Sequence, residues 1–369
     1  MEDIINHEQF RQTIQAAVRQ HSTQYTDSYS LSIRWEMDNT QAHRDTGHFQ
    51  SLLQTFHLPA AQELVIAATD DTPGWTLQGR FRQILSSAKQ NRGRALVIVH
   101  YAGHGEAQQD NGLDFVEHES GRRFSAQVFL FSMVMQNQGY ELSNDSNVDV
   151  LFLLDCCHSY VACRAPETSH RIVEVIAATD ESASLAYSPP RNTITAKLAG
   201  EIRRRQREGH KYVEFAEVVQ SLRAQPGAVK RPSHGLRMGA LSICLPFSGL
   251  TNVNPQHIQP PLRVVFGVHI TDNMTAGQLN NFVTWIQALP ANATITLEGV
   301  YPTSSTLLIL CAPYAVYSKL AGMRGYTFMA EVKGSNMMRQ PLRPVGSGSS
   351  ASPNKENIPL GASHGKQGL

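Results

Sequence analysis

Residues 95–105 (Ala-Leu-Val-Ile-Val-His-Tyr-Ala-Gly-His-Gly) and residues 148–159 (Val-Asp-Val-Leu-Phe-Leu-Leu-Asp-Cys-Cys-His-Ser) decide the fold of this chain. Each stretch begins with an apolar run that is short enough, and rich enough in β-branched residues, to favour a strand over a helix. Continuous apolar strands are typical of a parallel sheet that is covered on both faces. In such sheets the reactive groups lie at the carboxyl ends of the strands. The sequence therefore predicts that His104 and Cys157 lie at the same edge of one sheet.

A histidine paired with a cysteine indicates nucleophilic catalysis. A thiol with a pKa of about 8.5 is only a few per cent thiolate at neutral pH, so a neighbouring imidazole has to remove its proton. We expect His104 to be this base and Cys157 to be the nucleophile. The backbone N–H groups of Gly105 and Cys157 are the expected donors to the oxyanion that forms during acyl transfer.

Both blocks resemble the signature blocks of the caspase and metacaspase superfamily of cysteine peptidases, peptidase family C14. The usual metacaspase forms are Ser-Gly-His-Gly and Asp-x-Cys-His-Ser-Gly, and this chain has Tyr-Ala-Gly-His-Gly at 101–105 and Asp-Cys-Cys-His-Ser at 155–159. The histidine lies about 50 residues before the cysteine, as it does in caspases. The resemblance covers roughly residues 28 to 247, and it implies that Cys157, not Cys156, is the nucleophile.

The resemblance also implies a substrate preference. In metacaspases, the aspartate two residues before the nucleophile lines an acidic pocket for a basic residue at the cleavage site. That role is carried over to Asp155, with Asp45 as a weaker second carboxylate. An Arg or Lys side chain would find charge-assisted partners there, whereas cleavage after Asp would need basic residues that the motif lacks.

Two positions depart from the family pattern. Ala102 replaces the serine two residues before the catalytic histidine, and Tyr160 replaces the glycine after Cys-His-Ser. The first change removes a polar wall of the expected pocket, and the second is expected to crowd the cleft. These departures keep open a second hypothesis, a catalytically silent caspase-like module that binds partners or regulates them.

Metal chemistry is a competing hypothesis. Adjacent cysteines followed directly by histidine lack the paired Cys-x-x-Cys spacing of zinc sites, although a zinc site is conceivable from four residues: Cys156, Cys157, His158 and Cys163. No spacing of acidic residues resembles an EF-hand. Calcium activation is implied by the family resemblance alone, and we expect no other cofactor.

Composition narrows the class of protein. The 369 residues include 41% hydrophobic residues and carry a formal net charge of +1, so neither nucleic acid nor a membrane is an expected partner. A protein or peptide substrate is expected instead. Five cysteines without framework spacing, and a start without signal-peptide character, predict a cytoplasmic enzyme. The one basic cluster, residues 203–207, reads as a solvated helix face or a protease-sensitive site.

The chain is expected to have five parts: an N-terminal helical extension at 1–28, a caspase-like peptidase domain at 29–250, a linker at 251–261, a C-terminal domain at 262–334 and a disordered tail at 335–369. Further strands are expected at 31–35, 64–67, 172–178 and 241–245. Together with the helical patterns between them, they predict an α/β fold with a doubly wound, mostly parallel sheet. We expect a single-chain enzyme, and Arg164 and Arg171 are the sites at which a basic-specific enzyme could cut itself.

The C-terminal part has its own pattern. Strand-like segments at 262–270, 294–300, 306–311 and 326–332 alternate with helical segments at 276–289 and 313–320. This βαββαβ order predicts a ferredoxin-like α+β domain. It has no catalytic constellation, so docking of a protein partner, dimerisation and regulation are open hypotheses for it.

Overall fold

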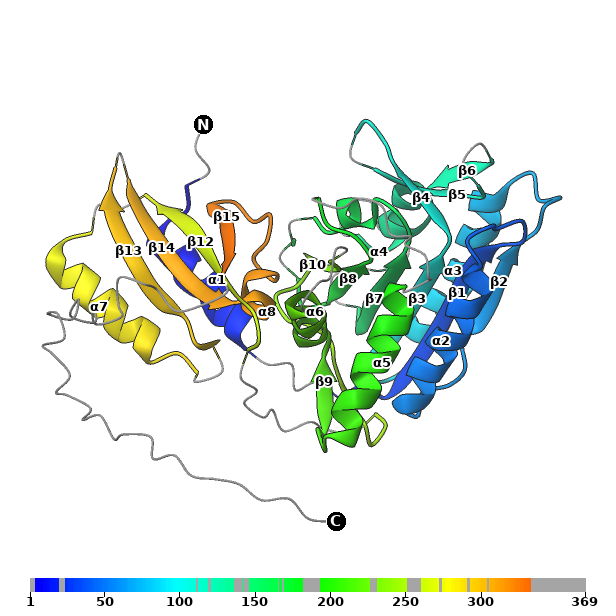
Figure 1. Cartoon of the computed structure of the whole chain (residues 1–369), viewed down its shortest axis with the longest axis horizontal. Helices are drawn as coiled ribbons and strands as arrows, with labels where there is room; N and C mark the ends of the chain where they lie inside the picture. Colours follow the sequence, from blue (N-terminus) through cyan, green and yellow to red (C-terminus); the bar gives the residue numbers. More distant parts are fainter. Residues whose placement is uncertain are drawn as a thin grey trace, which may run out of the picture. The chain divides into compact units, whose positions relative to one another are not determined.

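A computed structural model of the chain shows a central sheet of six strands in the order β10-β8-β7-β3-β1-β2 (Figure 1). The strands are β1 (Asp27–Trp35), β2 (Gln62–Ile66), β3 (Ala95–Ala102), β7 (Val148–Asp155), β8 (Val173–Ala177) and β10 (Ser233–Met238). Neighbours pair in parallel except for β10, which is antiparallel to β8. The expected doubly wound, mostly parallel α/β sheet is therefore confirmed.

The structure describes residues 4–19, 24–110, 112–118, 121–135, 142, 146–164, 166–167, 169–181, 193–225, 231–250, 260–271, 274–290, 293–303 and 305–332. Most of the expected linker at 251–261, the end of the expected C-terminal domain and the whole of the expected tail at 335–369 lie outside these residues. Contacts gather residues 1–332 into one unit. The division into separate domains stays a prediction.

Helices cover both faces of the central sheet. On one face lie α2 (Ala42–Thr55), α5 (Ile194–Arg207) and α6 (Phe215–Ala224), and on the other lie α3 (Pro73–Lys89), a π-helical turn (Gln127–Phe131) and α4 (Ser132–Val134). The side chains of β3 explain this arrangement, since Leu96 and Ile98 enter the first core while Val97 and Val99 enter the second. A strand that is buried on both faces is therefore mostly apolar, and its polar residues, such as His100, need hydrogen-bond partners inside the fold.

The edge strand of the sheet is not the expected one. The segment at 241–245 was expected to complete the sheet, but β10 does so, while β11 (Cys244–Pro246) pairs with β9 (Tyr212–Glu214) in a separate two-stranded sheet. The sequence of β10 does not look like a strand because it contains polar residues. The buried His234 in particular resembles an interruption of a strand. In the fold, His234 Nε2 lies 2.6 Å from Glu174 Oε1 on β8, which satisfies both groups.

A small antiparallel sheet follows the histidine block. It consists of β4 (His104–Ala107), β5 (Leu113–Val116) and β6 (Arg123–Ser125), in that order. The sequence did not reveal these strands, since each has only three or four residues. They matter because β4 begins at His104 itself.

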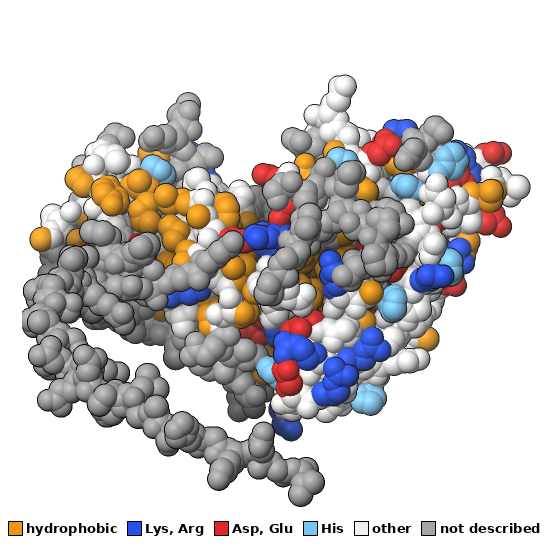
Figure 2. Space-filling model, in the orientation of Figure 1, with side chains coloured by type: hydrophobic (Ala, Val, Ile, Leu, Met, Phe, Trp, Pro, Cys, Tyr) orange, Lys and Arg blue, Asp and Glu red, His pale blue; other side chains and the backbone are white. Residues whose placement is uncertain are grey.

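The C-terminal elements are β12 (Arg263–Ile270), α7 (Ala276–Gln287), β13 (Thr296–Pro302), β14 (Thr306–Pro313), α8 (Tyr314–Tyr317) and β15 (Tyr326–Val332). Their strands form an antiparallel sheet in the order β13-β14-β12-β15. Figure 2 shows hydrophobic side chains gathered over this sheet. Tyr301, Phe328 and Met329 are large hydrophobic residues that expose 56%, 47% and 54% of their surface.

The N-terminal helix α1 (His7–Val18) packs against these C-terminal elements. A capping box between Asn6 and Gln9 starts the helix. Its buried Phe10 ring lies 5.4 Å from the ring of Phe282 on α7, and Ile5 bridges to Ile270 of β12. No helix in the described ranges has both the length and the apolar content of a membrane span.

Candidate active site

The register of β3 and β7 brings the two sequence blocks together. These strands are parallel neighbours, and their last paired residues are Ala102 and Asp155. The next residues leave the sheet side by side, and the Gly103 N–H donates to the Asp155 carbonyl 3.3 Å away. His104 and Cys157 each lie two residues beyond the last pair. The strand order also reverses between β1 and β3, the point at which open α/β sheets form their crevice.

His104 is held from both sides. The Tyr101 hydroxyl donates to the His104 carbonyl oxygen at 2.7 Å, and the Tyr101 ring stacks on Phe115 with 3.6 Å between ring centroids. His104 Nε2 lies 2.5 Å from Asn39 Oδ1, in the loop that follows β1. Because an amide oxygen only accepts, Nε2 carries the proton in this contact and the lone pair of a neutral imidazole is on Nδ1.

The two cysteines differ in environment. Cys156 is fully buried, whereas Cys157 is half-buried. Burial raises the pKa of the Cys156 thiol well above its usual value, with smaller contributions from Cys157 and Asp155. Since the thiolate is the reactive form, Cys156 is chemically inert at neutral pH. This difference supports the prediction that Cys157 is the nucleophile.

The loop that carries Cys157 is anchored to the end of β8. His158 adopts a left-handed conformation with φ of 55°, and a 3₁₀ helix follows at Ser159–Ala162. The buried Ser159 Oγ accepts from the Ala178 N–H at 2.9 Å. The backbone of His158 thus turns the chain from the end of β7 into the 3₁₀ helix.

Gly105 packs directly on the loop that carries Cys157. A Cβ at this position would lie 2.4 Å from the Cys157 carbonyl oxygen and 2.8 Å from Cys156 Sγ. The sequence suggested that glycine serves the approach of a substrate carbonyl. The structure gives a second reason, which is close packing between the two blocks; the oxyanion role stays a prediction.

Asp155 and Asp45 reach the same helix start. Asp155 Oδ2 accepts from the Thr195 N–H at 2.9 Å and from the Thr195 hydroxyl at 2.7 Å. Asp45 Oδ1 accepts from the hydroxyl of Thr193, the N-cap of α5, at 2.7 Å. Both carboxylates are buried, with 7% and 1% exposure. The structure therefore gathers the two predicted pocket residues, although they lie 110 positions apart in the sequence.

The two departures from the family pattern occupy different environments. Ala102 is fully buried at the end of β3. Tyr160 lines a cavity of about 510 Å³, together with Asp180, Arg223 and Phe328. Tyr160 thus borders open space, and its effect on the substrate cleft stays a prediction.

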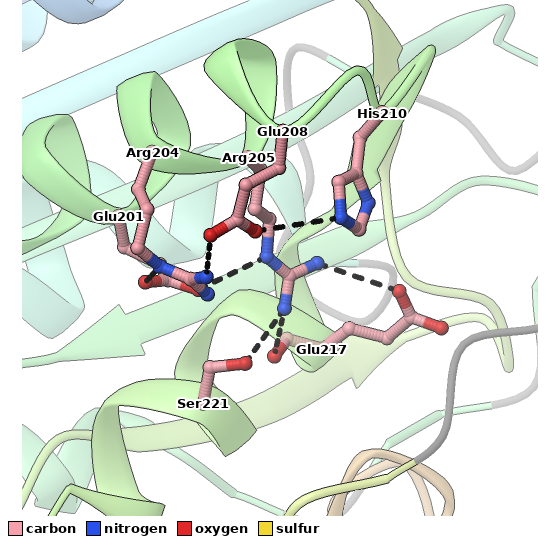
Figure 3. A network of polar contacts seen from close by, with 7 residues as sticks. All are labelled: Glu201, Arg204, Arg205, Glu208, His210, Glu217 and Ser221. Carbon is pink, nitrogen blue, oxygen red and sulfur yellow. Dashed lines mark hydrogen bonds and ion pairs between the residues drawn. The ribbon is translucent and has the colours of Figure 1, made fainter.

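The basic cluster of α5 is neutralised within the fold (Figure 3). Arg204 pairs with Glu201 at 2.7 Å and with Glu208 at 2.5 Å. Arg205, with only 4% of its side chain exposed, pairs with Glu201 at 3.1 Å and reaches Glu217 of α6 at 3.6 Å. Arg205 anchors the C-terminal end of α5 to α6, so the expectation of a solvated helix face is wrong for this residue, because it pairs with two carboxylates inside the fold.

The described residues do not fit a metal ion. Among them, no group of three or more His, Cys, Asp or Glu side chains is arranged to hold one. The four residues of the zinc hypothesis all lie in the described part of the chain. No chemical step is assigned to a metal.

Four residues at the site escaped the sequence reasoning: Asn39, His100, Thr193 and Thr195. Asn39 and the threonines carry no motif of their own. His100 stands inside an apolar strand, where a lone histidine has no recognisable pattern.

Comparisons with known proteins relate this chain to one family. A family model described as Caspase domain matches residues 4–239, which is more than half of the chain and includes both blocks. Among solved structures, the chain is similar to caspase-1 from Spodoptera frugiperda, with 12% sequence identity and a TM-score of 0.40 over 63% of this chain and 94% of that one. No curated protein matches the sequence.

Proposed function

This chain belongs to the caspase-domain family of cysteine peptidases, and from that premise we propose that it is an endopeptidase in which His104 activates Cys157. The observation that carries the proposal is the pairing of β3 with β7, which ends at Ala102 and Asp155. It supports a dyad because both residues leave adjacent strands at equal distance from the last pair. The burial of Cys156 leaves Cys157 as the one accessible thiol of the motif.

The contacts of His104 indicate how the dyad would work. With Nε2 bound to Asn39, the Nδ1 lone pair takes the proton from Cys157 Sγ, and the thiolate attacks the scissile carbonyl carbon. The oxyanion forms near the N–H groups of Gly105 and Cys157. The intermediate collapses to a thioester as the imidazolium donates its proton to the leaving amine. Water, activated by the same imidazole, then hydrolyses the thioester and frees the thiol.

The proposed substrate preference is a basic residue at the cleavage site. Two carboxylates, Asp155 and Asp45, converge on one helix start beside the nucleophile loop. Buried carboxylates interact strongly with a guanidinium or ammonium group because the surroundings screen charge poorly. An acidic residue would be repelled there. The proposed activity is therefore metacaspase-like cleavage after Arg or Lys.

A catalytically silent module is the second candidate. The observation that favours it is Tyr160, which lines the 510 Å³ cavity at a position where the family has glycine. In this case the cleft would bind a peptide without cutting it. The dyad geometry is compatible with both candidates, and turnover separates them.

The deciding experiment uses the purified full chain, with and without calcium, on peptides that end in Arg, Lys or Asp before a reporter group. We expect turnover after Arg and Lys, its loss in Cys157→Ala, and its retention in the matched variant Cys156→Ala. A thiol-directed peptide probe with a terminal Arg should label Cys157. Failure of both turnover and labelling would reject the enzyme, and turnover only after Asp would reject the acidic pocket.

A further inference from the structure

A continuous chain of hydrogen bonds runs from the interior of the sheet to Asp155. Ser32 Oγ of β1 lies 3.0 Å from His100 Nδ1, and His100 Nε2 lies 3.1 Å from Thr195 Oγ1. The Thr195 hydroxyl continues to Asp155 Oδ2 at 2.7 Å. Ser32, His100 and Thr195 are all fully buried. The chain therefore joins β1, β3 and α5 to the carboxylate at the end of β7.

The donor and acceptor of each hydrogen bond in this chain follow from Asp155, its last residue, because a carboxylate only accepts. The Thr195 hydroxyl gives its hydrogen to Asp155, so its oxygen has to accept from His100 Nε2. Burial lowers the pKa of His100 to about 3, so the ring is neutral and Nδ1 accepts from Ser32. One tautomer of His100 is compatible with all three contacts.

The chain also has a rigid frame. The His100 ring stacks on Phe49 of α2, with 4.7 Å between centroids and 24° between planes. Thr195 belongs to the first turn of α5, whose other end is anchored to α6 by Arg205 (Figure 3). Neither His100 nor Thr195 reaches the surface, so neither can touch a substrate.

We propose that Thr195 and His100 are positioning residues that hold the Asp155 carboxylate in the orientation that binds the basic side chain of the substrate. This inference rests on the proposed function, since it concerns the pocket of the same site. Two hydrogen bonds from Thr195 to one carboxylate oxygen set the rotation of the carboxylate plane. His100 in turn sets the direction of the Thr195 hydroxyl. Specificity is thus determined in part by side chains that never contact the substrate.

The test compares Thr195→Val, which removes the hydroxyl and keeps the N–H, with Thr195→Ser, which keeps both. For peptides ending in Arg, we expect Thr195→Val to raise KM about tenfold with little change in kcat, since one hydrogen bond to a charged group is lost. Thr195→Ser should restore the wild-type KM. His100→Phe keeps the stacking on Phe49 but loses the N–H, and should raise KM about threefold. This second variant tests the proposal even where Thr195→Val does not fold.

Two further measurements separate positioning from general damage. Alkylation of Cys157 by uncharged iodoacetamide should proceed at the wild-type rate in all variants. Binding of agmatine, a small guanidinium compound, should weaken in the same variants that raise KM. The control variant Thr55→Val removes a hydroxyl bonded only within α2 and should change neither KM nor agmatine binding. A fall in kcat as large as the rise in KM, or slower alkylation of Cys157, would show that Thr195 has a structural role only. Either result would overturn the inference.

The proposed function and the inference can fail separately. If the wild type cleaves after Arg and Thr195→Val leaves KM unchanged, the inference fails while the function stands. If the wild type cleaves nothing but binds agmatine in a Thr195-dependent way, the function fails while the inference stands. If agmatine does not bind and no peptide is cleaved, both fail.

Discussion

Gly105 and Cys157 touch so closely that a Cβ on residue 105 would lie 2.4 Å from the Cys157 carbonyl oxygen. We predict that Gly105→Ala displaces the nucleophile loop, lowers kcat at least tenfold and destabilises the fold by about 1–3 kcal/mol, as overpacking does. Peptide hydrolysis and urea unfolding measure both effects. The matched control is Gly79→Ala in α3, where a Cβ meets nothing within 4 Å and helix propensity favours alanine. Normal activity in Gly105→Ala would contradict the contact.

The second prediction concerns thiol reactivity. At neutral pH, iodoacetamide should modify Cys157 well before Cys156, because burial raises the pKa of the Cys156 thiol well above its usual value. Tandem mass spectrometry of the peptide with both adjacent cysteines locates the label. Equal labelling of Cys156 and Cys157 would mean that the loop opens in solution.

The third prediction concerns Asn39, whose oxygen orients the His104 ring. Asn39→Ala should lower kcat about tenfold or more, since the imidazole is then free to rotate away from Cys157. Asn39→Asp keeps an acceptor but adds a charge that favours the protonated imidazole. The acid limb of its pH–rate profile should therefore move to higher pH. If the acid limb is unchanged in Asn39→Asp and Asn39→Ala keeps full activity, Asn39 does not contribute to the site.

The fourth prediction is a pH dependence of stability. Burial lowers the pKa of His100 from 6.5 to about 3, so the unfolded chain binds a proton below pH 6.5 that the native fold does not bind. Stability should consequently fall as the pH drops from 6.5 towards 3, by roughly 1.4 kcal/mol per pH unit from this residue. Urea unfolding at several pH values in this range gives the free energy of unfolding. This free energy should depend less steeply on pH in His100→Gln than in the wild type. Identical slopes would mean that His100 becomes protonated in the native state.

The fifth prediction concerns self-cleavage. Arg171 is fully buried, with its Nη2 donating to the Val134 carbonyl at 2.6 Å, whereas Arg164 is exposed. If the enzyme cuts itself between β7 and β8, the cut should follow Arg164 and be lost in Arg164→Gln. Intact-mass measurement locates it. A cut after Arg171 in folded protein would require local unfolding of the start of β8.

The sequence was most informative where burial alone decides the structure. The apolar runs before His104 and Cys157 predict β3 and β7, since a strand in contact with two cores is apolar at most positions. It failed at β10, where a histidine is tolerated because Glu174 lies beside it. It also failed at Asn39, because a single loop amide acquires its role only from the residue it faces.

The paired carboxylates could be predicted only in part. Asp155 follows from the motif, but its partner Thr195 lies 40 residues away, and only the folded chain shows which hydroxyl it meets. His100 illustrates the same limit, since its contacts come from β1 and α5 at once. Long-range polar pairing leaves no periodic trace in a single sequence, unlike the burial of apolar faces.

The start of α5 carries a consequence for how such a pocket could evolve. The aligned peptide groups of a helix place a partial positive charge at its N-terminus, which stabilises the two carboxylates that meet Thr193 and Thr195. Replacing them with arginines to read acidic substrates would set cations against this field, at about 0.3–1 kcal/mol each. If the two carboxylates line the proposed pocket, the backbone at the start of α5 therefore helps to keep that pocket acidic.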